Sequence, residues 1–154
     1  MRLLGLIILG FFAVPAFAGS YMLLPIDEVY DGDTLVTHIH PTKLPPPLNI
    51  IRIRVRGIDT PEMPAKSFAT TYKLGRAECM EEAFTAIAAR NAIQMLVNEA
   101  PTKTMKVSNF EWGKYGGRVV ADVKINGQDI ATYLLERRYA VRYDGKTKTH
   151  DWCE

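Results

Sequence analysis

The clearest pattern in the chain is a strict alternation over residues 50–58, where isoleucine and valine occupy one face and three arginines the other. A period of two residues predicts a half-buried β-strand. A solvated polar face is sufficient to explain Arg52 and Arg56. Arg54 differs because it stands five residues before Asp59, and we expect it to serve a function.

Other segments show the periods of strands and helices. Pro101 ends a helix predicted over residues 76–98. Its predicted inner face consists of Met80, Ala83, Phe84, Ile87, Ala88, Ala92, Met95 and Leu96. Residues 63–75 are predicted to form a loop. The remaining predicted elements are two strands within residues 22–40 joined by an Asp-Gly turn at 31–33, strands over 104–110 and 118–125, and a helix over 128–139.

About five strands and two helices in one small unit predict an α+β, mainly β fold with a small barrel. Four prolines within residues 41–47 predict a stiff connection. No repeat or long linker divides the chain after its N-terminal segment. We therefore expect a single domain over residues 19–154.

The N-terminal segment has the three parts of a secretory signal peptide. Arg2 is followed by an apolar run over residues 3–12, and Ala16-Phe17-Ala18 provides the small residues expected before a cleavage point. The alternative is a retained N-terminal anchor, although the apolar run is short for a membrane span. We expect residues 1–18 to be removed and the protein to be exported, either to a periplasm or outside the cell.

The charge balance excludes one class of nucleic-acid-binding protein. Removing Arg2 with the signal peptide leaves 18 of the 19 basic residues against 17 acidic ones. A protein that coats nucleic acid electrostatically needs a much larger excess of positive charge. Any phosphate recognition therefore has to come from a local cluster, such as Lys43 with the three arginines of residues 52–56.

The two cysteines, Cys79 and Cys153, both lie in the part of the chain that would be exported. An even pair in an oxidising compartment predicts one disulfide. Two independent thiols are the alternative. The disulfide would tie the last residues of the chain to the start of the first predicted long helix.

Two short acidic segments indicate the chemistry of the protein. Asp31-Gly32-Asp33-Thr34 holds two carboxylates on a turn, where Gly32 gives the backbone freedom because it can take a positive φ. Asp59-Thr60-Pro61-Glu62 follows the arginine strand. Carboxylates on turns suit a hard cation such as Ca²⁺ or Mg²⁺, and adjacent arginines suit a phosphate. Turn-forming acids and a capped strand end are the alternatives. Together these groups are the parts of a phosphodiester hydrolase.

A third segment, Lys114-Tyr115-Gly116-Gly117-Arg118, precedes a predicted strand. Its glycines would let a phosphate or a base approach the backbone closely. Arg118 could then supply a second arm of a phosphate clamp with Arg54. Taken alone, the segment is an ordinary hairpin turn.

Three motifs, in this order, resemble the staphylococcal nuclease (thermonuclease) family. They are Val29 to Thr34, Arg54 to Glu62 with its Gly57-Ile58-Asp59-Thr60-Pro61 centre, and Tyr115 to Arg118 leading into a strand. Residues 127–140 also resemble the second helix of the family, so the resemblance covers about residues 22–143. It implies a five-stranded OB-type barrel with two or three packed helices and Ca²⁺-dependent cleavage of DNA and RNA. We expect a monomer with no part in a membrane after signal cleavage.

The resemblance also implies a role for each matched residue. In the family pattern, the ligands of Ca²⁺, rather than Mg²⁺, would be Asp33, Asp59 and the carbonyl of Thr60, with Asp31 as an acid in the outer shell of the cation. Glu62 would activate water, and Arg54 and Arg118 would bind the phosphate and stabilise the five-coordinate transition state. Lys114 and Tyr115 would contact the nucleotide. The mechanism is a metal-assisted in-line displacement that needs no covalent intermediate.

The chain departs from the family pattern at its C-terminus. Too few residues follow Tyr143 for the third helix of the family, and a Cys79–Cys153 disulfide would take over its stabilising role. The leading hypothesis is an exported, metal-dependent nuclease. The alternative is a catalytically silent OB-type module that binds nucleic acid or protein. Such modules usually lack the acids or arginines, and none is missing here.

Overall fold

The structure is a computed structural model that describes residues 20–38 and 49–154. The predicted signal peptide and the proline-rich segment 41–47 lie outside the described residues. Within the described ranges no helix is both long enough and apolar enough to cross a membrane.

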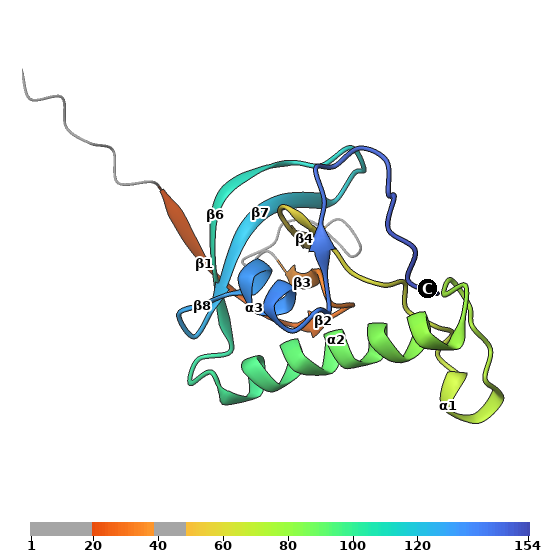
Figure 1. Ribbon diagram of the computed structural model, residues 1–154. Coiled ribbons are helices and arrows are strands. Elements are labelled where there is room, and N and C mark those ends of the chain that lie inside the picture. Colours follow the sequence, from red (N-terminus) through yellow and green to blue (C-terminus); the bar gives the residue numbers. More distant parts are fainter. Residues whose placement is uncertain (1–19, 39–48) are drawn as a thin grey trace, which may run out of the picture.

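Most described strands belong to one seven-stranded sheet, and two short strands form a separate pair (Figure 1). The strands are β1 (Tyr21–Pro25), β2 (Glu28–Val29), β3 (Thr34–His38), β4 (Ile50–Val55), β5 (Ile58–Asp59), β6 (Thr104–Trp112), β7 (Arg118–Ile125), β8 (Gln128–Asp129) and β9 (Val141–Arg142). The order of the main sheet is β1-β6-β7-β4-β3-β2, β8 pairs with β7, and β5 pairs with β9. Only the β4–β7 pair is parallel among these, so it brings together the two halves of the chain.

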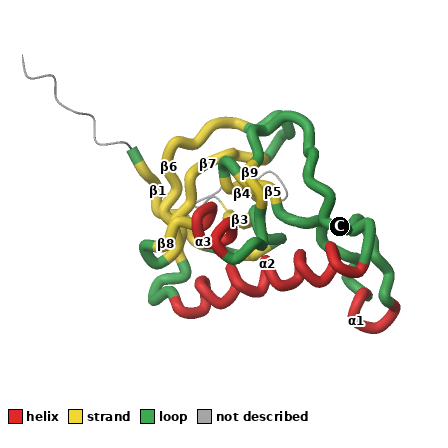
Figure 2. Tube along the Cα trace, in the orientation of Figure 1, coloured by secondary structure: helices red, strands yellow, loops and turns green. Residues whose placement is uncertain are grey.

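Three helices occur in the described part of the chain: α1 (Phe68–Thr71), α2 (Met80–Glu99) and α3 (Ile130–Glu136). Figure 2 shows the long α2 running beneath the strands, with the single turn of α1 beyond its N-terminal end. Helix α3 contacts β7 and β8, and α2 contacts β2. The α+β, mainly β class is therefore confirmed, and the pairing of the described strands follows an open path.

The alternation that predicted β4 is the alternation that builds the core. Ile53 and Val55 are almost completely buried and pack in one cluster with Val107 of β6 and Ile93 of α2. Because side chains alternate along a strand, the arginines of β4 lie on the opposite face. The sheet therefore presents a row of guanidinium groups on the side away from its core.

Helix α2 differs from its prediction in start and in orientation. It begins at Met80 rather than near residue 76, because Cys79 caps it by accepting a hydrogen bond from the backbone N–H of Glu82. Phe84 and Met95 are 55% and 60% exposed, so their predicted burial is wrong. The buried face is built mainly of small side chains, namely Ala83, Ala86, Ala89, Ala92, Ile93 and Val97. Alanines allow the helix to lie close to the sheet.

The loop predicted for residues 63–75 also needs a correction, because it contains α1. Phe68 is the buried residue of this turn and packs with Ala77 and Ala83 in a small second cluster. The additional helix, α1, therefore precedes α2 in the chain. The segment after Tyr143 contains no helix, as its length predicted.

Candidate active site

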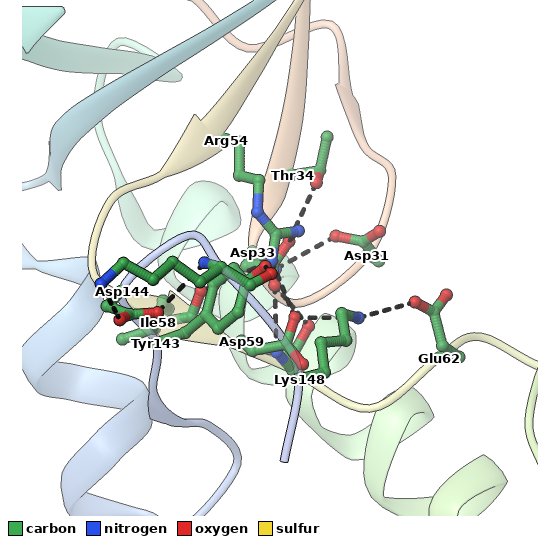
Figure 3. A network of polar contacts seen from close by, with 12 residues as sticks. Asp31, Asp33, Thr34, Arg54, Ile58, Asp59, Glu62, Tyr143, Asp144 and Lys148 are labelled. Atoms are coloured by element: carbon green, nitrogen blue, oxygen red, sulfur yellow. Dashed lines mark hydrogen bonds and ion pairs between the residues drawn. The ribbon is translucent and has the colours of Figure 1, made fainter. Parts of the chain in front are cut away.

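The two acidic segments meet at Arg54, whose guanidinium bridges a carboxylate from each (Figure 3). Arg54 Nη1 lies 2.6 Å from Asp33 Oδ1, and Nη2 lies 2.8 Å from Asp59 Oδ1. Asp33 follows β2 and precedes β3, whereas Asp59 lies in β5. The two aspartates are only 1% and 4% exposed. The spacing that singled out Arg54 therefore produces a direct, buried ion pair.

Asp33 is further held by the segment that follows β5. The backbone N–H and the hydroxyl of Thr60 both donate to Asp33 Oδ2, at 3.0 and 3.1 Å. The hydroxyl of Thr34 donates to the other carboxylate oxygen at 3.0 Å. Asp31 completes the turn because its Oδ1 accepts a hydrogen bond from the backbone N–H of Asp33 at 3.1 Å. These bonds fix the two acidic segments against each other.

Gly32 is required here for its size and not for its backbone angle. Gly32 does not use the positive φ that is open to a glycine. A Cβ at this position would lie 2.9 Å from both Ala89 Cβ and Thr60 Cγ2. The acidic turn therefore lies directly against α2, and a side chain at residue 32 would push Asp33 away from Thr60.

Asp31, Asp33 and Asp59 repel one another, and Arg54 offsets this repulsion only in part. Burial raises the pKa of Asp33 to about 7, repulsion from Asp31 and Asp59 adds to this, and Arg54 opposes it. Burial also raises the pKa of Asp31. Burial alone would lower the pKa of Arg54, but Asp33 and then Asp59 raise it overall. Repulsion between acids away from water is relieved by a further cation.

Glu62 lies at the edge of the cluster and is partly exposed. Its Oε1 lies 3.0 Å from Lys148 Nζ, and its Oε2 lies 3.3 Å from Arg76 Nη2. Burial tends to raise the pKa of Glu62, but the bond from Lys148 and the charges of Lys148, Arg76 and Arg54 lower it overall. Glu62 is therefore ionised at neutral pH.

Glu82 is a buried residue of the site that the sequence analysis missed. Its Oε1 accepts the backbone N–H of Glu62 at 3.0 Å, and its Oε2 accepts that of Glu78 at 2.6 Å. It stands three residues after the capping Cys79, where a glutamate commonly receives N–H groups at the start of a helix. This position was a usable signal for the cap, but not for the contact with Glu62.

Lys148 is the second residue that was missed. Its Nζ lies 3.0 Å from Asp59 Oδ1 and 3.0 Å from Glu62 Oε1, so it links the two acids (Figure 3). Burial tends to lower the pKa of Lys148, but its bonds to Glu62 and Asp59 raise it overall. Because 86 residues separate it from Glu62, no local pattern announced this contact.

The predicted disulfide between Cys79 and Cys153 is present, with 5.9 Å between the two Cα atoms. It anchors the last residues of the chain at the start of α2. A cleft of about 490 Å³ lies beside this anchor and is lined by Asp59, Thr60, Glu62, Glu78, Glu82 and residues 148–153. Glu62 and Asp59 therefore both line this cleft.

The segment of residues 114–118 lies outside the ionic cluster. Arg118 pairs in register with Arg52 at the start of the parallel β4–β7 ladder, so its side chain projects on the arginine face. Arg54 lies two residues further along the neighbouring strand than Arg52, the partner of Arg118. The rise along a strand and the spacing between strands then put the Cα atoms of Arg118 and Arg54 about 8 Å apart. The exposed ring of Tyr115 lies 5.4 Å from the Arg118 guanidinium carbon, and Lys114 Nζ lies 3.4 Å from the Gly145 carbonyl oxygen.

The donors at the centre of the site fit a divalent cation of the hard class. In residues 20–38 and 49–154 there is no cluster of three or more His, Cys, Asp or Glu side chains that forms a complete metal cage. Asp33 and Asp59 nevertheless provide oxygen donors on adjacent segments, and the Thr60 carbonyl belongs to the same turn. Ca²⁺ and Mg²⁺ accept such ligands together with water. The repulsion that Asp31 and Asp59 exert on Asp33 favours the same ion.

These features define a mainly β domain with an arginine-bridged acidic site at one edge of its arginine face. The model of one protein family, described as staphylococcal nuclease homologue, matches residues 52–152. The chain belongs to this family, which is of the nuclease type, acts on nucleic acids and uses a divalent metal. A search of curated proteins finds no match.

Proposed function

We propose that the protein is a metal-dependent nuclease that hydrolyses phosphodiester bonds of DNA and RNA by in-line attack of water. The observation that supports this most directly is the bridge from Arg54 to Asp33 and Asp59, with Glu62 at the rim of the adjoining cleft. This arrangement combines cation ligands, a phosphate-binding guanidinium and a proton acceptor. Membership of a nuclease-type family supports the same conclusion.

In this proposal Asp33, Asp59 and the Thr60 carbonyl hold Ca²⁺, and Asp31 acts from the outer shell. When bound, such a cation polarises the phosphoryl oxygen and lowers the pKa of water. Carboxylate and carbonyl oxygens suit Ca²⁺, which accepts irregular coordination more readily than Mg²⁺ does.

The side chains around the cation site divide the remaining tasks. The guanidinium of Arg54 binds the phosphate and stabilises the charge that grows in the transition state, where such donors have most effect. Arg118, on the same face of the sheet, forms the second arm. Glu62 is ionised and accepts a proton from the attacking water. Lys114 and Tyr115 contact the nucleotide beyond the cleft.

Digestion of DNA and RNA with purified protein tests this proposal. We expect cleavage with Ca²⁺, loss of cleavage with EGTA, and a loss of at least about 100-fold in kcat for Glu62→Gln, the range typical of a general base. Cleavage that survives both EGTA and Glu62→Gln would exclude the mechanism. Nucleic-acid binding without cleavage in Ca²⁺ would favour the silent OB-type module instead.

Export and a monomeric state are also part of the proposal. The signal-peptide pattern of residues 1–18 supports export, and the disulfide between Cys79 and Cys153 suits an oxidising compartment. Mass spectrometry of secreted or periplasmic protein should give a chain that begins at Gly19. Sedimentation should give the mass of one chain.

A further inference from the structure

The C-terminal segment, residues 143–153, crosses the acidic site and is named the C-terminal strap here. One end follows β9, which pairs with β5 beside Asp59. The other end is fixed to α2 by the disulfide of Cys153. Between them, the hydroxyl of Tyr143 donates to the Lys146 carbonyl at 2.7 Å. The strap is therefore held at both ends over the proposed cation ligands.

Lys148 is the residue of this strap that enters the site. Two clefts, each of about 490 Å³, flank it, and Asp59 and Lys148 line both of them. The side chain of Lys148 is 46% exposed, whereas that of Asp59 is only 5% exposed. The ammonium group therefore reaches a buried ligand from an open position, and it can leave without disturbing the core.

We propose that Lys148 is a positioning residue that competes with the divalent cation for Asp59, an inference that rests on the proposed function. Without the cation, the ammonium neutralises Asp59 and Glu62 and holds them together. A cation bound to Asp59 would lie within a few ångströms of that ammonium, and two positive charges at such a distance repel strongly in a partly buried site. Cation binding would therefore displace the Lys148 ammonium from Asp59, and Lys148 would keep its contact with Glu62.

The chemistry of the lysine side chain suits this exchange. An ammonium is a compact charge on a flexible four-carbon stem, so it can shift between two carboxylates with little change in the backbone. Because the disulfide keeps the strap in place, the displaced ammonium stays at high local concentration beside the site. Lys148 thus sets the cation affinity and keeps Glu62 in the cleft in both states.

Linkage makes this inference testable without measuring activity. If the cation weakens the contact of the ammonium with Asp59, the ammonium must weaken cation binding by the same factor. Removal of the ammonium should therefore strengthen cation binding. We expect Lys148→Met, which keeps the stem and removes the charge, to bind Ca²⁺ about fivefold or more tightly than the wild type in calorimetric titration. Lys148→Arg should stay near the wild type, and Lys146→Met, on an exposed strap residue, should not change the affinity.

Thermal melting gives a second measurement on the same proteins. In EGTA, Lys148→Met should melt below the wild type because Asp59 and Glu62 lose their shared counter-charge. On addition of Ca²⁺, its melting temperature should rise by more than that of the wild type. A role limited to packing of the strap predicts equal or weaker Ca²⁺ binding.

The Asp59→Asn variant separates the two levels of the proposal. Ca²⁺ binding that Asp59→Asn abolishes, but that Lys148→Met leaves unchanged or weakens, overturns the role of Lys148 alone. Absence of Asp59-dependent Ca²⁺ binding in the wild type overturns the proposed function and this inference with it.

Discussion

Replacement of Arg54 by methionine is the most direct test of the electrostatic design of the site. The substitution keeps much of the side-chain volume and removes the charge that bridges Asp33 and Asp59. Asp59 retains Lys148, but Asp33 is left with hydroxyl and backbone donors only. Loss of one partner from a buried ion pair costs about 3–5 kcal/mol when it is measured well above the pKa of Asp33, where the remaining carboxylate stays charged and away from water.

For a domain of this size that loss corresponds to a fall of about 10–20 °C in melting temperature. The assay is thermal or urea unfolding in EGTA, so that no added cation replaces the missing charge. Arg52→Met is the matched control, because Arg52 lies on the same strand and face but is exposed, and its guanidinium faces the ring of Tyr30 at 5.5 Å. Its effect should stay within about 0.5 kcal/mol.

The double variant Arg54→Met, Asp33→Asn isolates the cause of the effect. If the unpaired carboxylate is responsible, removal of its charge should recover part of the stability lost in Arg54→Met. An Arg54→Met protein that unfolds within about 1 kcal/mol of the wild type in EGTA would refute the reasoning. So would a double variant that is as unstable as the sum of its two single variants.

Three further predictions concern pH, the disulfide and Glu82. Because the folded pKa of Asp33, about 7, lies above its ordinary value of 3.8, its neutral form contributes stability that is present at low pH and is lost as the pH rises through 7. Urea unfolding in EGTA should show this fall between pH 5 and pH 8, and Asp33→Asn should make the curve flatter. Cys153→Ser should lower the free energy of unfolding by about 4 kcal/mol, because a long loop is opened while Cys79 keeps its capping role; an unchanged melting curve would contradict this. Glu82→Gln should lower the free energy of unfolding by about 1–3 kcal/mol, since one of two backbone N–H groups loses its acceptor. It should also lower nuclease activity through Glu62. The control Glu81→Gln, at an exposed position, should change neither stability nor activity.

Local patterns were sufficient to predict the centre of the site. Arg54 lies in β4, and Asp59 lies in β5 just after the turn that follows β4. A spacing of five residues therefore allows the two side chains to meet. Asp33 was predicted on a turn, and the pairing of β3 with β4 carries that turn to Arg54. These contacts follow from strand geometry, which a sequence expresses directly.

The outer parts of the site follow from tertiary packing and left no local signal. Lys148 reaches Glu62 only because the disulfide and the β5–β9 pair direct the strap. The buried face of α2 was predicted only in part: Ala83 and Ala92 are buried as expected, but hydrophobicity favoured Phe84 over Ala89. The helix in fact turns its alanines toward Gly32, where only small groups fit. Close approach between elements is a property of pairs of residues, and a single sequence does not display it.

The parallel pairing of β4 with β7 has a consequence for how the protein folds. It joins residues 52–55 to residues 118–121, so the loop between them, which includes all of α2, must close before the arginine face is complete. Contacts between distant parts of a chain form slowly because the entropy of loop closure is lost before the contacts form. Nuclease activity should therefore return later than helical circular dichroism when the unfolded protein is diluted out of urea. An intermediate in which only α2 has formed would lack the complete candidate active site.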